Sequence, residues 1–185
     1  MIIYSCAKVN IGLSIYGRRS DGYHLISTVF QELDFCDKIE IFKTERGCDF
    51  SSNVCWLGND DSNLCVIAFH KMKERFPSIK GIKINLTKRI PPGSGLGGGS
   101  SNAATIINGL NKIYRLNLKN RDREVIAEKI GADVPFFIKG MTQLGAGTGN
   151  KLSGILKPFK GIYLLVFPKV KISTTWAYDQ IRKKN

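Results

Sequence analysis

The sequence predicts a globular fold that mixes strands and helices. Apolar and polar residues alternate over much of the first 45 positions, and later segments repeat apolar residues at helical spacing. Between two such patterns lies a glycine-rich stretch, IPPGSGLGGGSSNAA at 90–104. With 185 residues, the chain is long enough for one well-formed domain, or for a domain and part of another.

The opening segment predicts antiparallel strands. Apolar residues at every second position from Val9 to Ile15 are typical of a half-buried strand, and GRRSDGYH at 17–24 supplies a turn. Residues 25–31 and 38–43 carry strand patterns as well, so we expect two further strands there.

The segments beside the glycine-rich stretch predict a helix, a strand and a second helix. We expect the first helix over 60–76, with Ser62 as its N-cap and an apolar face at 64, 67, 68 and 72. The alternation at 82–86 predicts a strand that leads into the glycines. Ser100 or Ser101 can cap the helix that follows, which should end near Ile113.

Later elements are predicted from shorter signals. A charged helix is expected over 122–130, and GADVPFF at 131–137 should end it, since Pro135 disfavours helical geometry at Val134. A loop is expected at 144–150, an apolar strand at 162–168, and a last helix capped by Ser173.

Composition excludes some classes of protein. The net charge of +13, from 28 basic and 15 acidic residues, favours polyanions such as nucleic acid, nucleotides or phosphorylated metabolites. No apolar run approaches the roughly 18 residues that span a bilayer, and the N-terminus has neither a signal nor a transit pattern, so we expect a cytoplasmic protein.

The five cysteines lack a C-x-x-C pair and are expected to be reduced and mostly buried. The spacing of Cys48, Cys55, Cys65 and His70 argues against a zinc site.

The glycine-rich stretch predicts an anion site. Glycines let the backbone approach a ligand, and the helix that follows offers unpaired N–H groups at its positive end. The stretch lacks the G-K-[ST] of a Walker loop. Gly93, Gly95 and Gly98 fit G-x-G-x-x-G, yet the acid that a dinucleotide site needs is missing, and neither a protein-kinase loop nor a flexible linker fits the flanking elements.

PPGSGLGGGSSNAA resembles the phosphate loop of the GHMP family of small-molecule kinases. AKVNIGLSIYGRRSDGYHLISTVFQ at 7–31 and IGADVPFF at 130–137 resemble the branch that phosphorylates a cytidyl diphosphate derivative of methylerythritol, on the non-mevalonate route to isoprenoid precursors. The resemblance implies an α+β fold. A GHMP nucleotide-binding and catalytic domain, like the second domain of ribosomal protein S5, would occupy 1–152. Residues 153–185 would begin an incomplete second α/β domain, because the family's later glycine-rich motif is absent.

The same resemblance implies the site residues. Lys8 and Asp133 would meet, with Asp133 accepting the proton of the substrate hydroxyl and Lys8 favouring its ionised form. ATP would be the phosphoryl donor, with Mg²⁺ held by Ser100 or Ser101. The positions expected to bind ATP are Asn63, Leu64, Lys88, Pro91, Pro92, Gly93, Ser94, Gly95, Leu96, Gly97, Gly98, Gly99, Ser100 and Ser101.

The acceptor would be a small molecule bound by Asn10, Tyr23, His24 and Tyr178. Two aromatic rings would sandwich the cytosine, and His24 would hydrogen-bond its edge. Each of these positions also has an ordinary structural interpretation. Without the resemblance, Lys8 would be interpreted as a solvated lysine at a strand end, Asp133 as a carboxylate in a turn, and Leu64 as a core residue. Tyr23 and His24 would belong to an ordinary turn, and Tyr178 would pack a helix.

Four functions remain open from the sequence. The first is the kinase just described, acting without nucleic acid or membrane. The others are a truncated relative that binds nucleotide without catalysis, a GHMP kinase for another small alcohol, and a basic nucleic-acid-binding protein. Ser94 and Asn150 depart from the family's usual residues.

Overall fold

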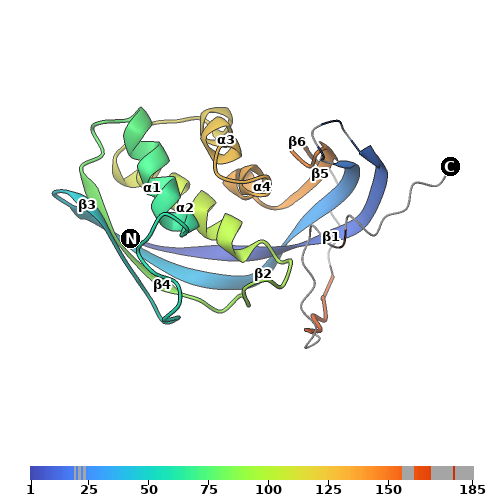
Figure 1. The fold of residues 1–185 in the computed structure, drawn as a ribbon, viewed down its shortest axis with the longest axis horizontal. Coiled ribbons are helices and arrows are strands. Elements are labelled where there is room, and N and C mark those ends of the chain that lie inside the picture. The colour runs from blue at the N-terminus through green and yellow to red at the C-terminus, as the bar shows by residue number, and fades with distance from the viewer. Residues whose placement is uncertain (19, 21, 23, 156–160, 168–176, 178–185) are drawn as a thin grey trace.

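The computed structural model describes residues 1–18, 20, 22, 24–155, 161–167 and 177. The elements in chain order are β1 (Ile2–Arg18), β2 (His24–Thr44), β3 (Gly47–Ser52), α1 (Leu64–Arg75), β4 (Gly81–Thr87), α2 (Gly98–Ile113), α3 (Asn120–Glu128), α4 (Val134–Lys139), β5 (Thr142–Gly147) and β6 (Lys151–Gly154). Strands and helices form one mixed fold, as the α+β expectation requires (Figure 1).

The sheet is organised around the long strand β2. Strand β1 pairs with it antiparallel along one side, and on the other side β5 pairs with residues 26–31 while β4 pairs with residues 38–44. Residues 32–37 of β2 therefore lie in a gap between β5 and β4. Strand β3 extends the sheet beyond β4, and β6 extends it beyond β5.

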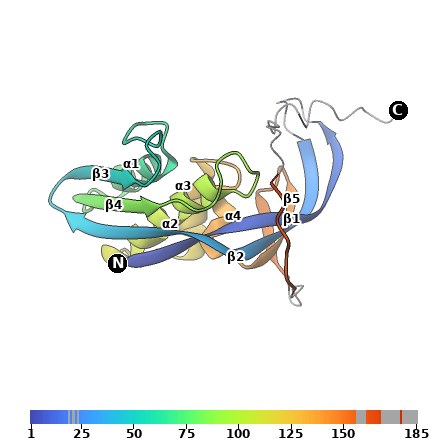
Figure 2. The same ribbon diagram turned by 90° about the horizontal axis from the view of Figure 1, so that it is seen from below.

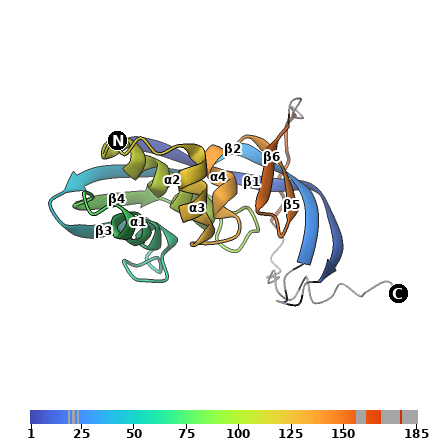
Figure 3. The same ribbon diagram turned by 90° about the horizontal axis from the view of Figure 1, so that it is seen from above.

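The helices cover one face of this sheet. Figure 2 shows the strands in front of the helices, and Figure 3, from the opposite side, shows the helices in front of the strands. Between the layers lie fully buried side chains, among them Ile39 and Ile41 of β2, Phe69 of α1, Ile106 of α2 and Phe136 of α4. The far ends of β1 and β2 curve away from this two-layer body (Figure 3).

Two strand predictions need correction. Residues 25–31 and 38–43 belong to the single strand β2, because Cys36 and its neighbours keep pairing with β1 through the gap. The predicted loop at 144–150 is a strand as far as Gly147, and only 148–150 form a turn. Gly145 allows this pairing, since a Cβ there would lie 2.4 Å from the Phe30 ring.

The starts of the first two helices also differ from prediction. Asn63, not Ser62, caps α1, and its Oδ1 accepts a hydrogen bond from Cys65 N at 2.9 Å. The N-cap of α2 is Gly97 in the left-handed region, so the helix begins at Gly98, ahead of both predicted serine caps. Its predicted end at Ile113 is confirmed.

The interruption after the charged helix lies where it was predicted, but its form is different. Helix α3 ends at Glu128, and Val134 is already the first residue of α4. Our expectation that Pro135 excludes Val134 from a helix was wrong. Pro135 stands in the first turn of α4, where its missing N–H has no intrahelical partner to lose.

Residues 161–167 form no strand, contrary to prediction. Tyr163 and Leu165 pack against a small apolar cluster that includes Leu33 and Leu96, while Ile162 and Leu164 are exposed. The predicted helix after Ser173 lies outside the described residues apart from position 177. The predicted domain boundary after 152 falls within β6 and stays a prediction.

The cysteines are not all reduced. Cys6 and Cys36 face each other across β1 and β2 and form a disulfide. Of the remaining three, only Cys65 is buried, while Cys48 is half-buried and Cys55 exposed, so the expectation of mostly buried thiols was also wrong. No helix among the described residues is long and apolar enough to cross a membrane.

Candidate active site

A cleft of about 990 Å³ joins the glycine-rich stretch to residues far away in the sequence. Lys8 and Asn10 of β1, His24 at the start of β2 and Asp133 at the start of α4 line it. So do most predicted ATP positions, namely Asn63, Leu64, Lys88, Pro91, Pro92, Gly93, Ser94, Gly95, Leu96, Gly97, Gly98, Gly99 and Ser100.

The loop between β4 and α2 owes its shape to its glycines. Gly93, Gly95 and Gly97 all have φ near +70° (68°, 75° and 69°), a conformation that residues with a side chain rarely adopt. At Gly97 space is limiting as well, because a Cβ there would lie 2.8 Å from the Phe137 ring and 3.3 Å from Cε of Lys8. The loop is joined to β1 by a 2.9 Å hydrogen bond from Lys8 N to Leu96 O.

Helix α2 presents its N-terminus to this cleft. No side chain caps its first turn, and Gly98, Gly99 and Ser100 all line the cleft. Unpaired N–H groups and the helix dipole make such an end attractive to an anion. The loop and helix together can therefore hold phosphate groups.

Lys8 and Asp133 face each other at one side of the loop. Nζ of Lys8 lies 3.7 Å from Oδ2 of Asp133 and donates a 2.8 Å hydrogen bond to Oδ1 of Asn10. The Lys8 side chain is only 9% exposed, whereas that of Asp133 is 43% exposed. A nearly buried ammonium thus stands behind a carboxylate that solvent, or a substrate, can reach.

Three other predicted ATP positions have structural roles. Asn63 is buried and caps α1, with Nδ2 donating to Gly58 O at 2.8 Å. Leu64 packs beside Gly99, where an added Cβ would lie 3.4 Å from its Cδ1. Ser101 is buried outside the cleft lining, and its Oγ accepts a 2.8 Å hydrogen bond from Ser5. The structure therefore does not place Ser101 as a magnesium ligand.

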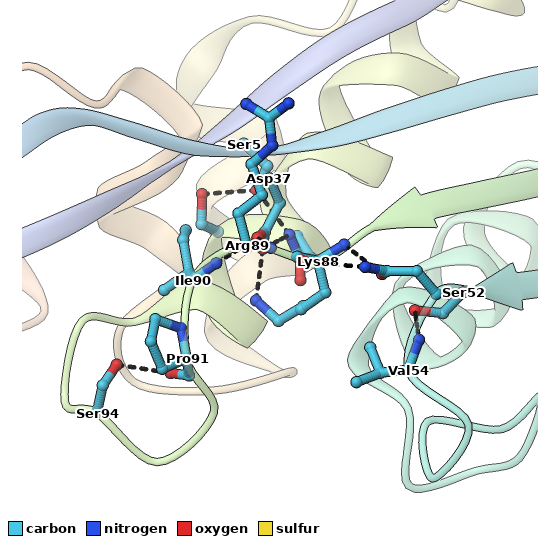
Figure 4. Close-up of polar contacts among 12 residues, drawn as sticks. Ser5, Asp37, Ser52, Val54, Lys88, Arg89, Ile90, Pro91 and Ser94 are labelled. Carbon is cyan, nitrogen blue, oxygen red and sulfur yellow. Dashed lines mark hydrogen bonds and ion pairs between the residues drawn. The ribbon is translucent and has the colours of Figure 1, made fainter.

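Lys88 lines the cleft but is already paired. Its ammonium forms an ion pair with Asp37, which is fully buried in the gap of the sheet (Figure 4). A Cβ at Gly98 would lie 2.8 Å from the Lys88 Nζ, so this cation stands close to the start of α2. Sequence reasoning missed Asp37, because an acid just ahead of an apolar strand reads as part of a turn.

The acceptor residues are described only in part. Asn10 and His24 line the cleft, whereas Tyr23 and Tyr178 lie outside the described residues. The lining also contains apolar and aromatic side chains that sequence reasoning did not select: Leu13, Ile26, Phe30, Trp56 and Leu57. Among the residues that the structure describes, no group of three or more His, Cys, Asp or Glu could hold a metal ion.

Ionisable groups near the cleft differ in their surroundings. Burial raises the pKa of the Cys65 thiol, which also lines the cleft, to about 12. Burial likewise raises the pKa of Glu32, which lies at the gap in the sheet, and a hydrogen bond from Met141 N lowers it in part. Cys65 is therefore a neutral thiol at physiological pH and a poor nucleophile.

Comparisons with known proteins relate the chain to a family of small-molecule kinases. The family model for the GHMP kinases N terminal domain matches residues 63–141. The 4-diphosphocytidyl-2-C-methyl-D-erythritol kinase of Chlorobaculum tepidum is 38% identical over 184 residues, which is 98% of this chain and 64% of that protein. Residues 63–141 thus match the N-terminal domain of the GHMP kinases.

Two further comparisons show the same partial coverage. The kinase of the same name from Clostridium tetani is 40% identical over all of this chain and 66% of its own length. A crystal structure of 4-(cytidine 5'-diphospho)-2C-methyl-D-erythritol kinase superposes with a TM-score of 0.83 at 33% identity, covering 99% of this chain and 65% of that one. The chain thus spans less than two thirds of the relatives it matches.

The two departures from the usual GHMP residues are accommodated locally. The Ser94 hydroxyl donates a 2.6 Å hydrogen bond to Pro91 O within the phosphate loop. Oδ1 of Asn150 accepts a 3.1 Å hydrogen bond from the Thr148 hydroxyl in the turn between β5 and β6.

Proposed function

We propose that this chain is the nucleotide-binding and catalytic part of a kinase. The enzyme transfers the γ-phosphoryl group of ATP to the 2-hydroxyl of 4-diphosphocytidyl-2-C-methyl-D-erythritol, in the cytoplasm, on the non-mevalonate route to isoprenoid precursors. The observation that carries the proposal is the Lys8–Asp133 pair in the same cleft as the phosphate loop. The names of the relatives support the choice of substrate.

The pair can assist phosphoryl transfer by handling the acceptor proton. The substrate hydroxyl oxygen attacks the γ-phosphorus while the bond from that phosphorus to the bridging oxygen breaks, and ADP leaves with the bonding electrons. The hydroxyl proton passes to the Asp133 carboxylate, whose side chain is the exposed member of the pair. The Lys8 ammonium lies 3.7 Å from this carboxylate and can stabilise negative charge during transfer, and its own position is fixed by Asn10.

The loop and the start of α2 would hold the phosphates of ATP. Backbone N–H groups at the uncapped helix end can bind phosphate oxygens without any lysine of the Walker type. Mg²⁺ usually retains several waters and binds ATP phosphates with few protein ligands, so an ion carried by the nucleotide needs few ligands from the chain. Ser100, at the cleft, is the candidate ligand that the sequence predicted.

The acceptor would occupy the other side of the Lys8–Asp133 pair. Asn10 and His24 line the cleft, as do the apolar side chains of Leu13, Ile26 and Phe30. We propose that His24 hydrogen-bonds the edge of the cytosine, and that Tyr23 and Tyr178 sandwich its ring.

Enzymatic assay decides between this kinase and its rivals. The chain would be incubated with ATP, Mg²⁺ and the cytidyl substrate, in parallel with a chimera that adds the remaining third of the Clostridium tetani relative. We expect the chimera to release ADP only when the substrate is present. ADP release with another small alcohol, but not with the cytidyl substrate, would favour a different GHMP kinase.

One alternative is a chain that binds nucleotide without catalysis. That alternative predicts ATP binding by the chain and turnover by the chimera alone.

The net charge of +13 leaves nucleic-acid binding as a further candidate function. A nucleic-acid-binding protein would show affinity for DNA or RNA that falls steeply with salt, and a slope near zero would exclude it.

A further inference from the structure

The buried carboxylate of Asp37 is hydrogen-bonded to the chain on both sides of the phosphate loop, which comprises residues 91–97, just before α2. Its Oδ1 accepts hydrogen bonds from the backbone N–H groups of Arg89 and Ile90, at 2.7 and 2.8 Å. Its Oδ2 accepts one from Nδ2 of Asn102 at 2.9 Å and one from the Lys88 ammonium. Arg89 and Ile90 precede the loop (Figure 4), and Asn102 lies in α2, which follows it.

The position of Asp37 explains why a side chain, and not a strand backbone, accepts these hydrogen bonds. The last backbone pair between β2 and β4 joins Lys38 to Thr87. Beyond this pair, the chain leaves the sheet at the gap between β4 and β5, and the N–H groups of Arg89 and Ile90 are not part of the strand pairing. The Asp37 carboxylate accepts hydrogen bonds from both of them, so the loop begins from a fixed point.

The far end of the loop is fixed by the same group. Nδ2 of Asn102 donates to Asp37 and, at 2.9 Å, to the hydroxyl of Ser5, which in turn donates to Ser101 at 2.8 Å. Asp37, Ser5, Ser101 and Asn102 are each no more than 2% exposed. Buried hydrogen bonds of this kind are costly to break, and bonds to a charged group are among the strongest.

We propose that Asp37 is a positioning residue for phosphate binding, because it sets the distance between the two ends of the loop. The inference rests on the proposed function, in which the loop holds ATP. Asp37 itself does not line the cleft and touches no substrate; it acts through the loop backbone and through α2. A loop already held in shape loses less conformational freedom when phosphates bind, and therefore binds them more tightly.

A pair of double variants isolates this role from charge. In D37N/K88M and D37A/K88M the buried ion pair is removed whole, so neither variant leaves an uncompensated charge. The asparagine variant keeps an oxygen that can accept from Arg89 N and Ile90 N, whereas the alanine variant does not. The two proteins thus have equal charge and differ in the clamp on the loop.

Tyr114→Phe is the matched control. The Tyr114 hydroxyl donates to Gly81 O at 2.8 Å and accepts from Gly81 N at 3.2 Å, so it ties the start of β4 to the C-terminal end of α2. Gly81 begins β4 and Tyr114 is the C-cap of α2, so these contacts lie at the ends remote from the loop. This variant should melt a few degrees lower than wild type and bind phosphates equally well.

The experiment measures the dissociation constants of ATP and of inorganic tripolyphosphate by calorimetry, at a temperature where thermal melts show every variant folded. We expect D37A/K88M to bind tripolyphosphate about tenfold more weakly than D37N/K88M, the equivalent of roughly one lost hydrogen bond. Equal affinities in the two double variants, or a loss in Tyr114→Phe as large as that in D37A/K88M, would overturn the proposal.

Two further outcomes are covered. If D37A/K88M does not fold, Asn102→Ala releases the α2 end of the loop alone, and wild-type affinity for tripolyphosphate in that variant would refute the positioning role. If wild type binds neither ATP nor tripolyphosphate, the proposed function fails and the inference fails with it. Binding by wild type with no difference among the variants removes only the inference.

Discussion

The ammonium of Lys8 and the carboxylate of Asp133 lie 3.7 Å apart, although one belongs to the first strand and the other to the start of the fourth helix. Strand β1 pairs with β2 on the side opposite β4 and β5, and the glycine-rich loop reaches β1 through the hydrogen bond from Lys8 N to Leu96 O. The fold thus brings a carboxylate, its counter-ion and the glycine-rich loop into one cleft.

The first prediction concerns Asp133 as the proton acceptor. In the chimera described above, Asp133→Asn should lower kcat by about 100- to 10,000-fold, because the amide cannot accept the hydroxyl proton. KM for ATP should change little, since the phosphates bind at the loop. Steady-state kinetics with both substrates varied would measure the two effects. Wild-type kcat in this variant would show that another group is the base.

The second prediction compares two loop glycines with almost the same φ. Gly97→Ala should lower the free energy of unfolding by about 2–4 kcal/mol, since it combines a left-handed backbone with a Cβ only 2.8 Å from the Phe137 ring. Gly93→Ala, with no atom within 4 Å of the added Cβ, should cost only about 1 kcal/mol. Urea unfolding of both variants measures the difference. Equal losses would mean that backbone conformation alone requires glycine at position 97.

Periodicity predicted some of the regular elements correctly, where a local pattern sets them. The strand before the loop and the end of α2 at Ile113 agree with prediction. Helix starts were less accurate, because capping depends on which polar group reaches the first turn: Asn63 bonds Cys65 N, while Ser62 bonds Asp60.

The parts of the site that were missed depend on tertiary structure. Asp37 contacts residues more than 50 positions away, and nothing in its neighbourhood indicates that its partners are backbone N–H groups at a break in the sheet. Likewise, no spacing rule joins Lys8 to Asp133, and only the resemblance to GHMP kinases predicted that they meet. The disulfide was missed because the pairing of Cys6 with Cys36 follows from the register of β1 on β2.

The third prediction tests that disulfide. Cys6 and Cys36 enclose a sequence separation of 30 residues, and closing a loop of this length should stabilise the fold by about 3–4 kcal/mol relative to the reduced protein. Protein purified without reductant should show the bond by peptide mass mapping, and adding reductant should lower its unfolding midpoint. The C6S/C36S variant should not respond to reductant. A wild type whose midpoint is also unchanged by reductant would contradict the prediction.

The last prediction concerns Glu32, which lies at the other end of the gap and accepts a 2.6 Å hydrogen bond from Met141 N. Because burial raises its pKa in the folded state above 4.5, the folded protein holds this proton more tightly, and the contribution to stability falls as pH rises from 4.5 through the folded pKa. Glu32→Gln removes this loss, so the variant should gain stability over wild type across that window and keep the gain at neutral pH.

Glu40→Gln is the control of opposite sign, because Lys38 lowers the pKa of Glu40. The contribution of Glu40 to stability is present above pH 4.5 and is lost as pH falls through its folded pKa. This variant should therefore be less stable than wild type at neutral pH. Thermal melts from pH 4 to 8 measure both, and a Glu32→Gln advantage that shrinks as pH rises would refute the assignment.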